Sequence, residues 1–211
     1  MRVGSSLTDT INFEKFKRLE SLHVLRGLPI DIPSTVTSLT TTTFDGQKYT
    51  QLSNLQQLVA IQVQNNLHFC PSLQNLTITF SPNIDVMATI STLSLLTALS
   101  IQVLSPDLLP YFADLHRLEL LNVDYRIYNQ DVDVEPIMLL TRLTALAIKS
   151  CTKVTGMDKI SNLTNLHSLN LIARNVQNIN ASDIIALKKL TTLAWQLPTK
   201  FFCSKMTQLR E

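Results

Sequence analysis

The spacing of apolar residues is the feature that most constrains how this chain can fold. In the segment ISNLTNLHSLNL, residues 160–171, an apolar residue stands at every third position, and the last step shortens to two. A single amphipathic helix needs steps of three and four, and a half-buried strand needs strict alternation. The segment therefore combines a helical or 3₁₀ approach with a short strand.

The last three apolar positions of this segment, L-x-x-L-x-L, recur along the chain. The nine matches are Leu19/Leu22/Val24, Val36/Leu39/Thr41, Leu58/Ile61/Val63, Leu73/Leu76/Ile78, Leu96/Leu99/Ile101, Leu118/Leu121/Val123, Leu143/Leu146/Ile148, Leu166/Leu169/Leu171 and Leu190/Leu193/Trp195. Of these 27 positions 26 are apolar, Thr41 being the exception, whereas a 45% hydrophobic composition gives about 12. The first residues of successive matches are 17, 22, 15, 23, 22, 25, 23 and 24 apart. The chain is therefore built from internal repeats.

Each repeat predicts one coil of a stacked structure. The x-L-x-L part is a short strand whose two leucines point inward, and the preceding three-step is the inner side of a helical or 3₁₀ turn. One coil cannot cover its own leucines, so neighbouring coils must stack and share one interior. Ile61, Leu99 and Leu146 are therefore expected inside. All eight prolines fall outside the strand windows, as a central strand requires.

The pattern resembles that of the leucine-rich repeat family, whose units run L-x-x-L-x-L-x-x-N/C-x-L, over about residues 13–197. Asn66 and Cys151 stand at the N/C position of their repeats. The resemblance implies an α/β solenoid of about nine coils. A curved parallel sheet lines its concave face, and short helices, 3₁₀ turns and extended segments form its convex face. The repeats of 17 and 15 residues leave no room for an outer helix.

The whole chain, residues 1–211, is expected to form one such domain. Residues 1–18 form an N-terminal cap, with a helix over 8–18 that turns Ile11, Phe13 and Phe16 toward the first coil. Residues 19–197 hold the repeats. Residues 198–211 form a degenerate C-terminal coil or cap, or else the start of a longer array.

Motifs for catalysis, cofactors or metals do not stand out. The glycines are isolated and the histidines lie in different repeats, so the chain is predicted not to be an enzyme and to need no cofactor or metal. Asp131, Asp133 and Glu135 in DVDVEP suit a cation site or a solvated loop, and the lack of a glycine-bearing calcium loop favours the solvated loop.

Location is predicted from the N-terminus and the cysteines. No run of apolar residues suggests a secretory signal or a membrane span, and Cys70, Cys151 and Cys203 are an odd number. We therefore expect reduced thiols packed into coils, and an intracellular, cytoplasmic protein without a membrane partner. The glycan acceptor motifs at Asn75, Asn162 and Asn180 have a role only in a secreted protein.

The residues between and beside the leucines point out of the sheet and are nearly all small and uncharged. For the repeat that begins at Leu58, the L-x-x-L-x-L match predicts that Ala60, Gln62 and Gln64 point outward. Over the nine repeats only Asp124 and Lys149 are charged among these positions. A nucleic acid needs several basic residues. A protein or peptide partner therefore fits this face, and nucleic acid does not.

A rim patch next to the strands is the predicted partner-binding site. Phe80, Val103 and Tyr125 share one repeat position and should stack about 5 Å apart. Aromatic and arginine residues gathered at an edge are typical of binding hot spots. The alternative is that Phe80 and Val103 fold inward to close their coils. The complete predicted site is Phe80, Val103, Asp124, Tyr125, Arg126, Tyr128 and Lys149.

The function that follows is a non-catalytic protein–protein interaction module, which binds through the concave sheet and its rim. The alternative is a cell-surface adhesion or ligand-binding protein of the internalin type, which the short repeats also resemble. A third hypothesis makes the chain the recognition part of a catalytic assembly. The cysteines and the N-terminus favour the intracellular scaffold.

Overall fold

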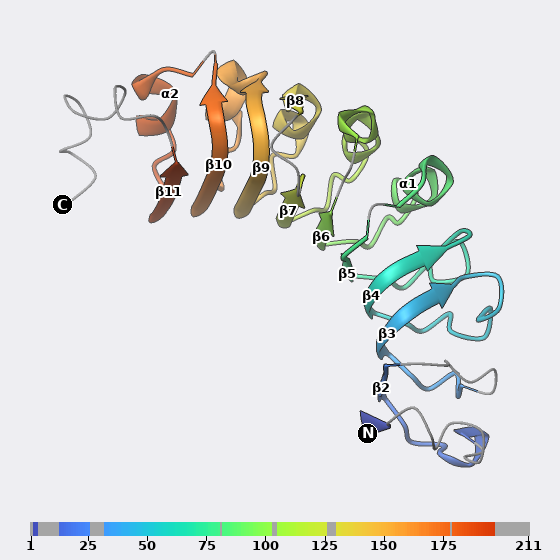
Figure 1. Ribbon diagram of the computed structural model, residues 1–211. Helices are drawn as coiled ribbons and strands as arrows, with labels where there is room; N and C mark the ends of the chain where they lie inside the picture. The colour runs from blue at the N-terminus through green and yellow to red at the C-terminus, as the bar shows by residue number, and fades with distance from the viewer. Residues whose placement is uncertain are drawn as a thin grey trace. The chain divides into compact units, whose positions relative to one another are not determined.

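The computed structural model of the 211-residue chain describes residues 2–3, 13–25, 32–80, 82–102, 105–125, 130–177 and 179–196. The chain divides into two compact units, Met1–Gln102 and Val103–Glu211. Both units consist of parallel strands joined by turns, 3₁₀ segments (η) and short α-helices (Figure 1).

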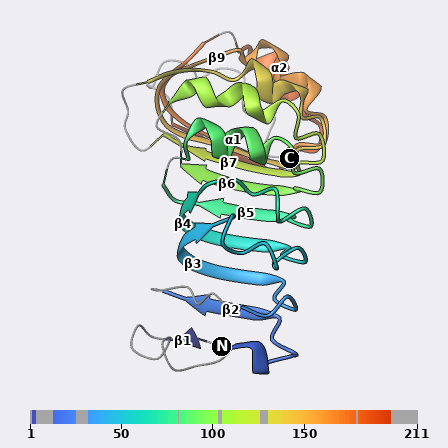
Figure 2. The same ribbon diagram turned by 90° about the vertical axis from the view of Figure 1, so that its right-hand side faces the viewer.

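The first unit holds β1 to β6. Its elements are β1 (Arg2–Val3), η1 (Phe13–Lys15), β2 (Ser21–Val24), β3 (Ser38–Asp45), β4 (Gln57–Gln64), β5 (Asn75–Ile78), α1 (Ile84–Ile90) and β6 (Ala98–Gln102). Each strand pairs in parallel with the next, in chain order. Figure 2 shows β1 to β6 lying one above another.

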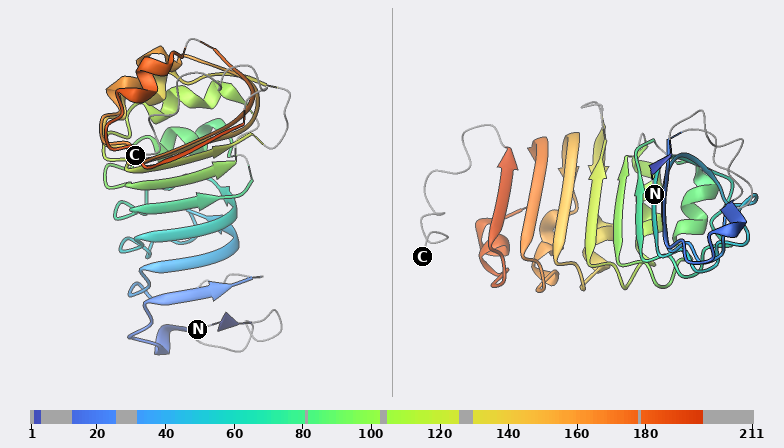
Figure 3. Two further views of the ribbon diagram at one scale, coloured as in Figure 1. Left: turned by 90° about the vertical axis from the view of Figure 1, so that its left-hand side faces the viewer. Right: turned by 90° about the horizontal axis from the view of Figure 1, so that it is seen from below.

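The second unit has the same plan with larger coils. Its elements are η2 (Pro106–Phe112), β7 (Leu120–Asp124), β8 (Asp131–Asp133), η3 (Glu135–Leu139), β9 (Ala145–Thr155), η4 (Met157–Asn162), β10 (Ser168–Val176), α2 (Ala181–Ile185) and β11 (Thr192–Gln196). β7, β9, β10 and β11 pair in parallel in this order, and β8 pairs with the second half of β9. In the right panel of Figure 3 these strands run side by side, from yellow-green to red-orange.

Backbone hydrogen bonds explain the three-residue step. The amide of each apolar residue in the step donates to the carbonyl of the apolar residue three positions earlier, as Leu55 does to Leu52. The same bond joins Leu73 to Cys70, and it recurs in the later coils with N···O distances of 2.9–3.2 Å. Three residues per turn place these side chains on one side of the backbone. The approach to such a strand is a 3₁₀-like run that turns the apolar residues of the three-residue step inward.

The strands complete the same interior. The two inward residues at the repeat's core positions in β2–β7, β9 and β10 are at most 1% exposed, except Thr41 in β3, which is 5% exposed. The Thr41 hydroxyl donates to the carbonyl of Thr43 at 3.3 Å. Leu99 and Leu146 are 0% exposed, as expected. Leu193 and Trp195 of β11, the last described strand, are half-buried.

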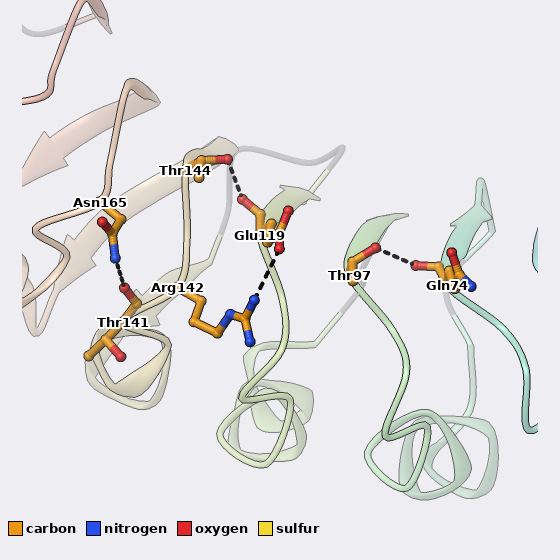
Figure 4. Close-up of polar contacts among 7 residues, drawn as sticks. All are labelled: Gln74, Thr97, Glu119, Thr141, Arg142, Thr144 and Asn165. Carbon is orange, nitrogen blue, oxygen red and sulfur yellow. Dashed lines mark hydrogen bonds and ion pairs between the residues drawn. The ribbon is translucent and has the colours of Figure 1, made fainter.

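A repeated hydrogen-bond clamp joins neighbouring coils where each strand begins. The carbonyl of the residue after the first leucine accepts two amides of the next coil, and the Glu119 carbonyl thus accepts those of Thr144 and Ala145 at 2.8 and 3.1 Å. Where the next coil has threonine at this position, its hydroxyl donates to the same carbonyl. The Thr144 hydroxyl donates to the Glu119 carbonyl at 3.0 Å, and the Thr97 hydroxyl donates to the Gln74 carbonyl at 3.3 Å (Figure 4).

The expected frame is wrong in β4. Leu58 pairs with Leu39 and Leu76, and Ala60 pairs with Thr41 and Ile78, so the inward residues are Leu58 and Ala60. Ile61, expected in the interior, is 45% exposed. This repeat therefore begins at Leu55. The first residues of the early repeats are then 17, 19 and 18 apart, instead of 17, 22 and 15. The sequence allows both frames, because Leu55, Leu58, Ile61 and Val63 overlap two copies of the motif.

The corner after each strand also differs from expectation. β3, β4, β9 and β10 run past the repeat's six core positions and bend. After two outward residues, Phe44 and Val63 turn inward and pair with each other. Val63, not Asn66, stands at the N/C position of its repeat, and Cys151 holds that position in β9 and is fully buried.

In the described residues, the outer helical segments α1 and η2–η4 lie in the longer coils. The repeat beginning at Leu55, which the expected frame made 15 residues long, has turns on its outer side as predicted, and so does the repeat beginning at Val36. The outer side of the 17-residue repeat beginning at Leu19 includes residues 26–31, which lie outside the described residues. The predicted solvated loop DVDVEP is instead the strand β8 followed by η3, although its three carboxylate residues are exposed.

In the predicted N-terminal cap the described residues are 2–3, which form β1, and 13–18, which begin with the single 3₁₀ turn Phe13–Lys15. Phe13 is fully buried as expected, but Phe16 is 40% exposed. Their ring centroids lie 6.1 Å apart. Residues 8–12 of the predicted helix, with Ile11, and the predicted C-terminal cap at 198–211, with Cys203, lie outside the described residues.

The β4 frame can be tested by a pair of variants. Leu58→Ala removes a fully buried side chain, and we expect it to lower the free energy of unfolding by about 2–5 kcal/mol. Ile61→Ala, at an exposed strand position, should cost less than about 1 kcal/mol. Urea unfolding of both variants measures this difference. Equal losses would place Ile61 in the interior.

Candidate binding faces

The alternation of strand residues gives each unit one sheet face that is not covered by its own interior. In the first unit we call this surface the first sheet face. Its three cross-strand rows are Ser21–Ser38–Gln57–Asn75–Ala98, His23–Thr40–Val59–Thr77–Ser100 and Leu25–Thr42–Ile61–Thr79–Gln102.

The first sheet face carries no Asp, Glu, Lys or Arg in these fifteen positions. Hydroxyl and amide groups dominate it, and one pair bonds across strands, Ser38 Oγ donating to Gln57 Oε1 at 3.2 Å. β4 presents Val59 and Ile61 between threonines on both neighbouring strands, since Thr40 and Thr77 both stand opposite Val59. This surface suits uncharged groups of a ligand.

Three large apolar side chains are exposed on or just beside the first sheet face: Ile61 within β4, Leu25 directly after β2 and Phe80 two residues after β5. Leu25, Ile61 and Phe80 are 46%, 45% and 54% exposed. The Phe80 amide donates to the Ile61 carbonyl at 2.7 Å, so these two residues are immediate neighbours. Exposed apolar residues next to a neutral polar surface are typical of a protein contact.

The second sheet face, formed by β7 and β9–β11, has a different character. Asn122 and Asn170 stand on either side of Ala147, on the two strands that flank β9. Leu120 is 41% exposed, and Asp124 stands directly opposite Lys149. Small side chains between amide groups, with one acid and one base at the edge, again favour polar contacts over phosphate binding.

The predicted rim patch includes residues of both units. Phe80 is exposed in the first unit, so the alternative that it folds inward is wrong. Asp124 and Lys149 are brought together in the second unit. Val103, Arg126 and Tyr128 lie outside the described residues.

Tyr125 is a buried side chain, only 1% exposed, and is not a surface anchor. Its amide donates to the Lys149 carbonyl at 2.9 Å, which continues the sheet by one residue and turns the ring inward. Burial, and then the nearby Cys151, raise the pKa of the Tyr125 phenol. The expectation that it stacks with Phe80 along an exposed rim is therefore wrong.

The buried thiols are structural. Cys70 and Cys151 are free and buried, as predicted. Burial raises the pKa of Cys70 to about 12 and that of Cys151 to about 11. Both stay protonated at neutral pH, which leaves little of the reactive thiolate.

The described part of the chain contains no group of three or more His, Cys, Asp or Glu residues placed to hold a metal ion. None of its helices is long and apolar enough to cross a membrane.

Sequence reasoning missed Gln57, Val59 and Ile61 as outward residues of β4, because the wrong frame turned Ala60, Gln62 and Gln64 outward. Ala60 is in fact buried, 1% exposed. One signal could have found the error. The frame beginning at Leu55 makes the early spacings nearly equal, whereas the frame beginning at Leu58 gives 22 followed by 15.

Two of the similar solved structures are internalins of Listeria monocytogenes. Internalin C2 superposes with a TM-score of 0.59 at 19% identity, covering 82% of this chain and 78% of that one. Internalin F superposes with a TM-score of 0.57 at 21% identity, covering 77% of this chain and 49% of that one. The chain has the leucine-rich repeat fold.

Other leucine-rich repeat structures have the same arrangement of coils. TLR13, solved as a complex with ssRNA13, superposes with a TM-score of 0.60 at 17% identity, over 87% of this chain and 29% of that one. The chain thus spans about half the length of internalin F and under a third of TLR13. No model of a known protein family matches the sequence. A search of curated proteins gives no match either.

Burial of Tyr125 leads to a stability prediction. No described residue bonds its hydroxyl, so Tyr125→Phe removes an unsatisfied buried polar atom and should raise the free energy of unfolding by about 1 kcal/mol. Tyr125→Ala should lower it by about 3–5 kcal/mol. Thermal and urea unfolding measure both changes. A loss of stability in Tyr125→Phe would contradict the proposed environment.

Proposed function

We propose that this leucine-rich repeat chain is a non-catalytic interaction module that binds a protein or peptide partner through the first sheet face. The observation that carries the proposal is the neutrality of that face together with exposed Ile61 and Phe80 beside it. A fold of stacked coils supplies a wide, rigid strand surface for such a contact.

The composition of the face favours protein over nucleic acid. TLR13 was solved with ssRNA13, so RNA is the alternative to weigh. Phosphate groups are held mainly by Lys and Arg, and the fifteen positions of the first sheet face have neither. Hydroxyls, amides and exposed aliphatic groups suit a peptide backbone and apolar side chains instead.

We further propose that the protein acts inside the cell rather than as an internalin-type surface protein. Asn75 of the glycan acceptor motif Asn75-Leu76-Thr77 is exposed in β5, on the first sheet face itself. A glycan there would cover the proposed contact. Free, buried Cys70 and Cys151 suit a reducing compartment.

Affinity capture with designed variants tests the binding function. The purified chain, tethered and exposed to lysate of its source cell, should retain a defined protein, identified by mass spectrometry. Ile61→Asp and Phe80→Asp each place a carboxylate in the contact and should weaken retention about tenfold or more. Direct titration of the identified partner measures the loss.

The matched control for these variants is Ile84→Asp. Ile84 is 57% exposed and begins α1, away from the strands. The Ile84→Asp variant should retain the partner as the wild-type chain does. If the partner binds both sheet variants normally, the first sheet face is not its site. If ribonuclease treatment releases the captured material, the ligand is RNA.

The location proposal has its own measurement. Native protein from its source cell should show no mobility change after peptide N-glycosidase treatment, and should resist protease added to intact cells. The chain expressed with a secretory leader in a eukaryotic host is the positive control for glycan addition. Removal of a glycan from the native protein would establish the surface alternative.

A further inference from the structure

A surface cavity of about 350 Å³ lies on the outer side of the second unit, where the coils carry their 3₁₀ segments. Pro110 and Ala113 come from η2 and its end, and Pro136 and Leu139 come from η3. Leu139 is 57% exposed, although it is a leucine in the turn that otherwise buries Ile137 and Met138. The floor of the cavity is therefore apolar and open to solvent.

Three charged residues complete the lining. Lys159 of η4 forms an ion pair with Glu135 of η3, which bridges two successive outer segments. Asp133, at the end of β8, forms no ion pair with any described residue. Its Oδ1 accepts a hydrogen bond from the Glu135 amide at 3.1 Å, and its other carboxylate oxygen has no bond to the described chain. The cavity thus has one uncompensated negative charge.

The neighbouring glycine fixes this carboxylate. Gly156 has a φ of 75°, and a Cβ atom added there would lie 2.2 Å from Asp133 Oδ1 and 2.6 Å from the Glu135 nitrogen. Only glycine permits this close approach. Asp133 is therefore held with one oxygen on the backbone and the other free for a ligand.

We propose that this cavity binds an arginine side chain of a partner polypeptide. The aliphatic part of the side chain lies on Leu139 and Pro136, and the guanidinium group donates to Asp133. A long apolar stem with a cationic end matches an apolar floor with a free carboxylate at its edge. Arginine is favoured over lysine because a guanidinium group is more weakly hydrated than an ammonium and so loses less hydration energy beside apolar groups. The inference is independent of the first sheet face.

Lys159 sets the strength of this site. It neutralises Glu135 and places a positive charge next to the incoming guanidinium. Removing the Lys159 ammonium frees a second carboxylate and removes a repulsion between like charges. Two charge-changing variants should therefore shift arginine binding in opposite directions.

The test is an NMR titration of the ¹⁵N-labelled chain with N-acetyl-arginine amide, beside its uncharged analogue N-acetyl-citrulline amide. The arginine probe should shift the amide signals of Ala113, Glu135 and Leu139, and the citrulline probe should bind several-fold more weakly. Asp133→Asn, which keeps an oxygen for the Glu135 amide, should weaken arginine binding about two- to fivefold. Lys159→Gln should strengthen it by a similar factor.

Two control variants test whether arginine binding depends on this cavity rather than on the overall charge of the chain or on the first sheet face. Asp114→Asn removes an exposed negative charge that does not line the cavity, and Ile61→Asp alters the first sheet face. Both should bind the arginine probe as wild type does. Equal binding of the citrulline probe would indicate an apolar side chain as occupant and overturn the proposal. Unchanged affinity in Asp133→Asn, or weaker binding in Lys159→Gln, would also overturn it.

Discussion

The 3₁₀ hydrogen bond between apolar residues three apart is the interaction on which the rest of the structure depends. It gives the backbone three residues per turn, so Leu52 and Leu55, or Ile160 and Leu163, place their side chains on the same side. The chain then extends into a strand, where the inward step is two residues. The 3₁₀ run and the strand both place their apolar side chains in one interior, which explains why the spacing of apolar residues changes from three to two within twelve residues.

Burial of the inward leucines leaves each unit with one free strand surface, and the two surfaces differ in chemistry. The first sheet face is neutral, with branched aliphatic residues between threonines on β3 and β5. The second carries amides, alanines and the opposed Asp124 and Lys149. Since the inward strand positions are apolar except for Thr41, differences in binding must come from the outward positions, which packing leaves free to vary.

Much of this fold could be predicted, because inward leucines are dictated by the packing of every coil. The repeat, the parallel strands, the buried thiols and the helix-free short coils all follow from spacing and burial. The frame of β4 could not be decided from its own residues, since Ile61 is as apolar as a core residue and Ala60 is small. Pairing with β3 and β5 selects Ala60, and the nearly equal spacing of the early repeats agrees with this frame.

The rim patch failed for a related reason. Tyr125 and Phe80 share a repeat position, and the amide of each donates to the carbonyl of a neighbouring coil, Lys149 for Tyr125 and Ile61 for Phe80. The Tyr125 ring is nevertheless buried, whereas the Phe80 ring is exposed. Local backbone geometry at a strand end, which sequence spacing does not encode, decides which aromatic faces solvent. The outer cavity could not be predicted from the sequence either, because its lining comes from three separate segments, residues 110–113, residues 133–139 and Lys159.

The clamp at the start of each strand has a consequence for how such a chain can change. It anchors the Thr144 amide and hydroxyl to the preceding coil before the strand begins, so alignment is re-established at every winding. Insertions or deletions on the outer side of a coil therefore do not shift the register of the strands that follow. A lineage of such proteins could alter the periphery of one winding while keeping its recognition surface in register.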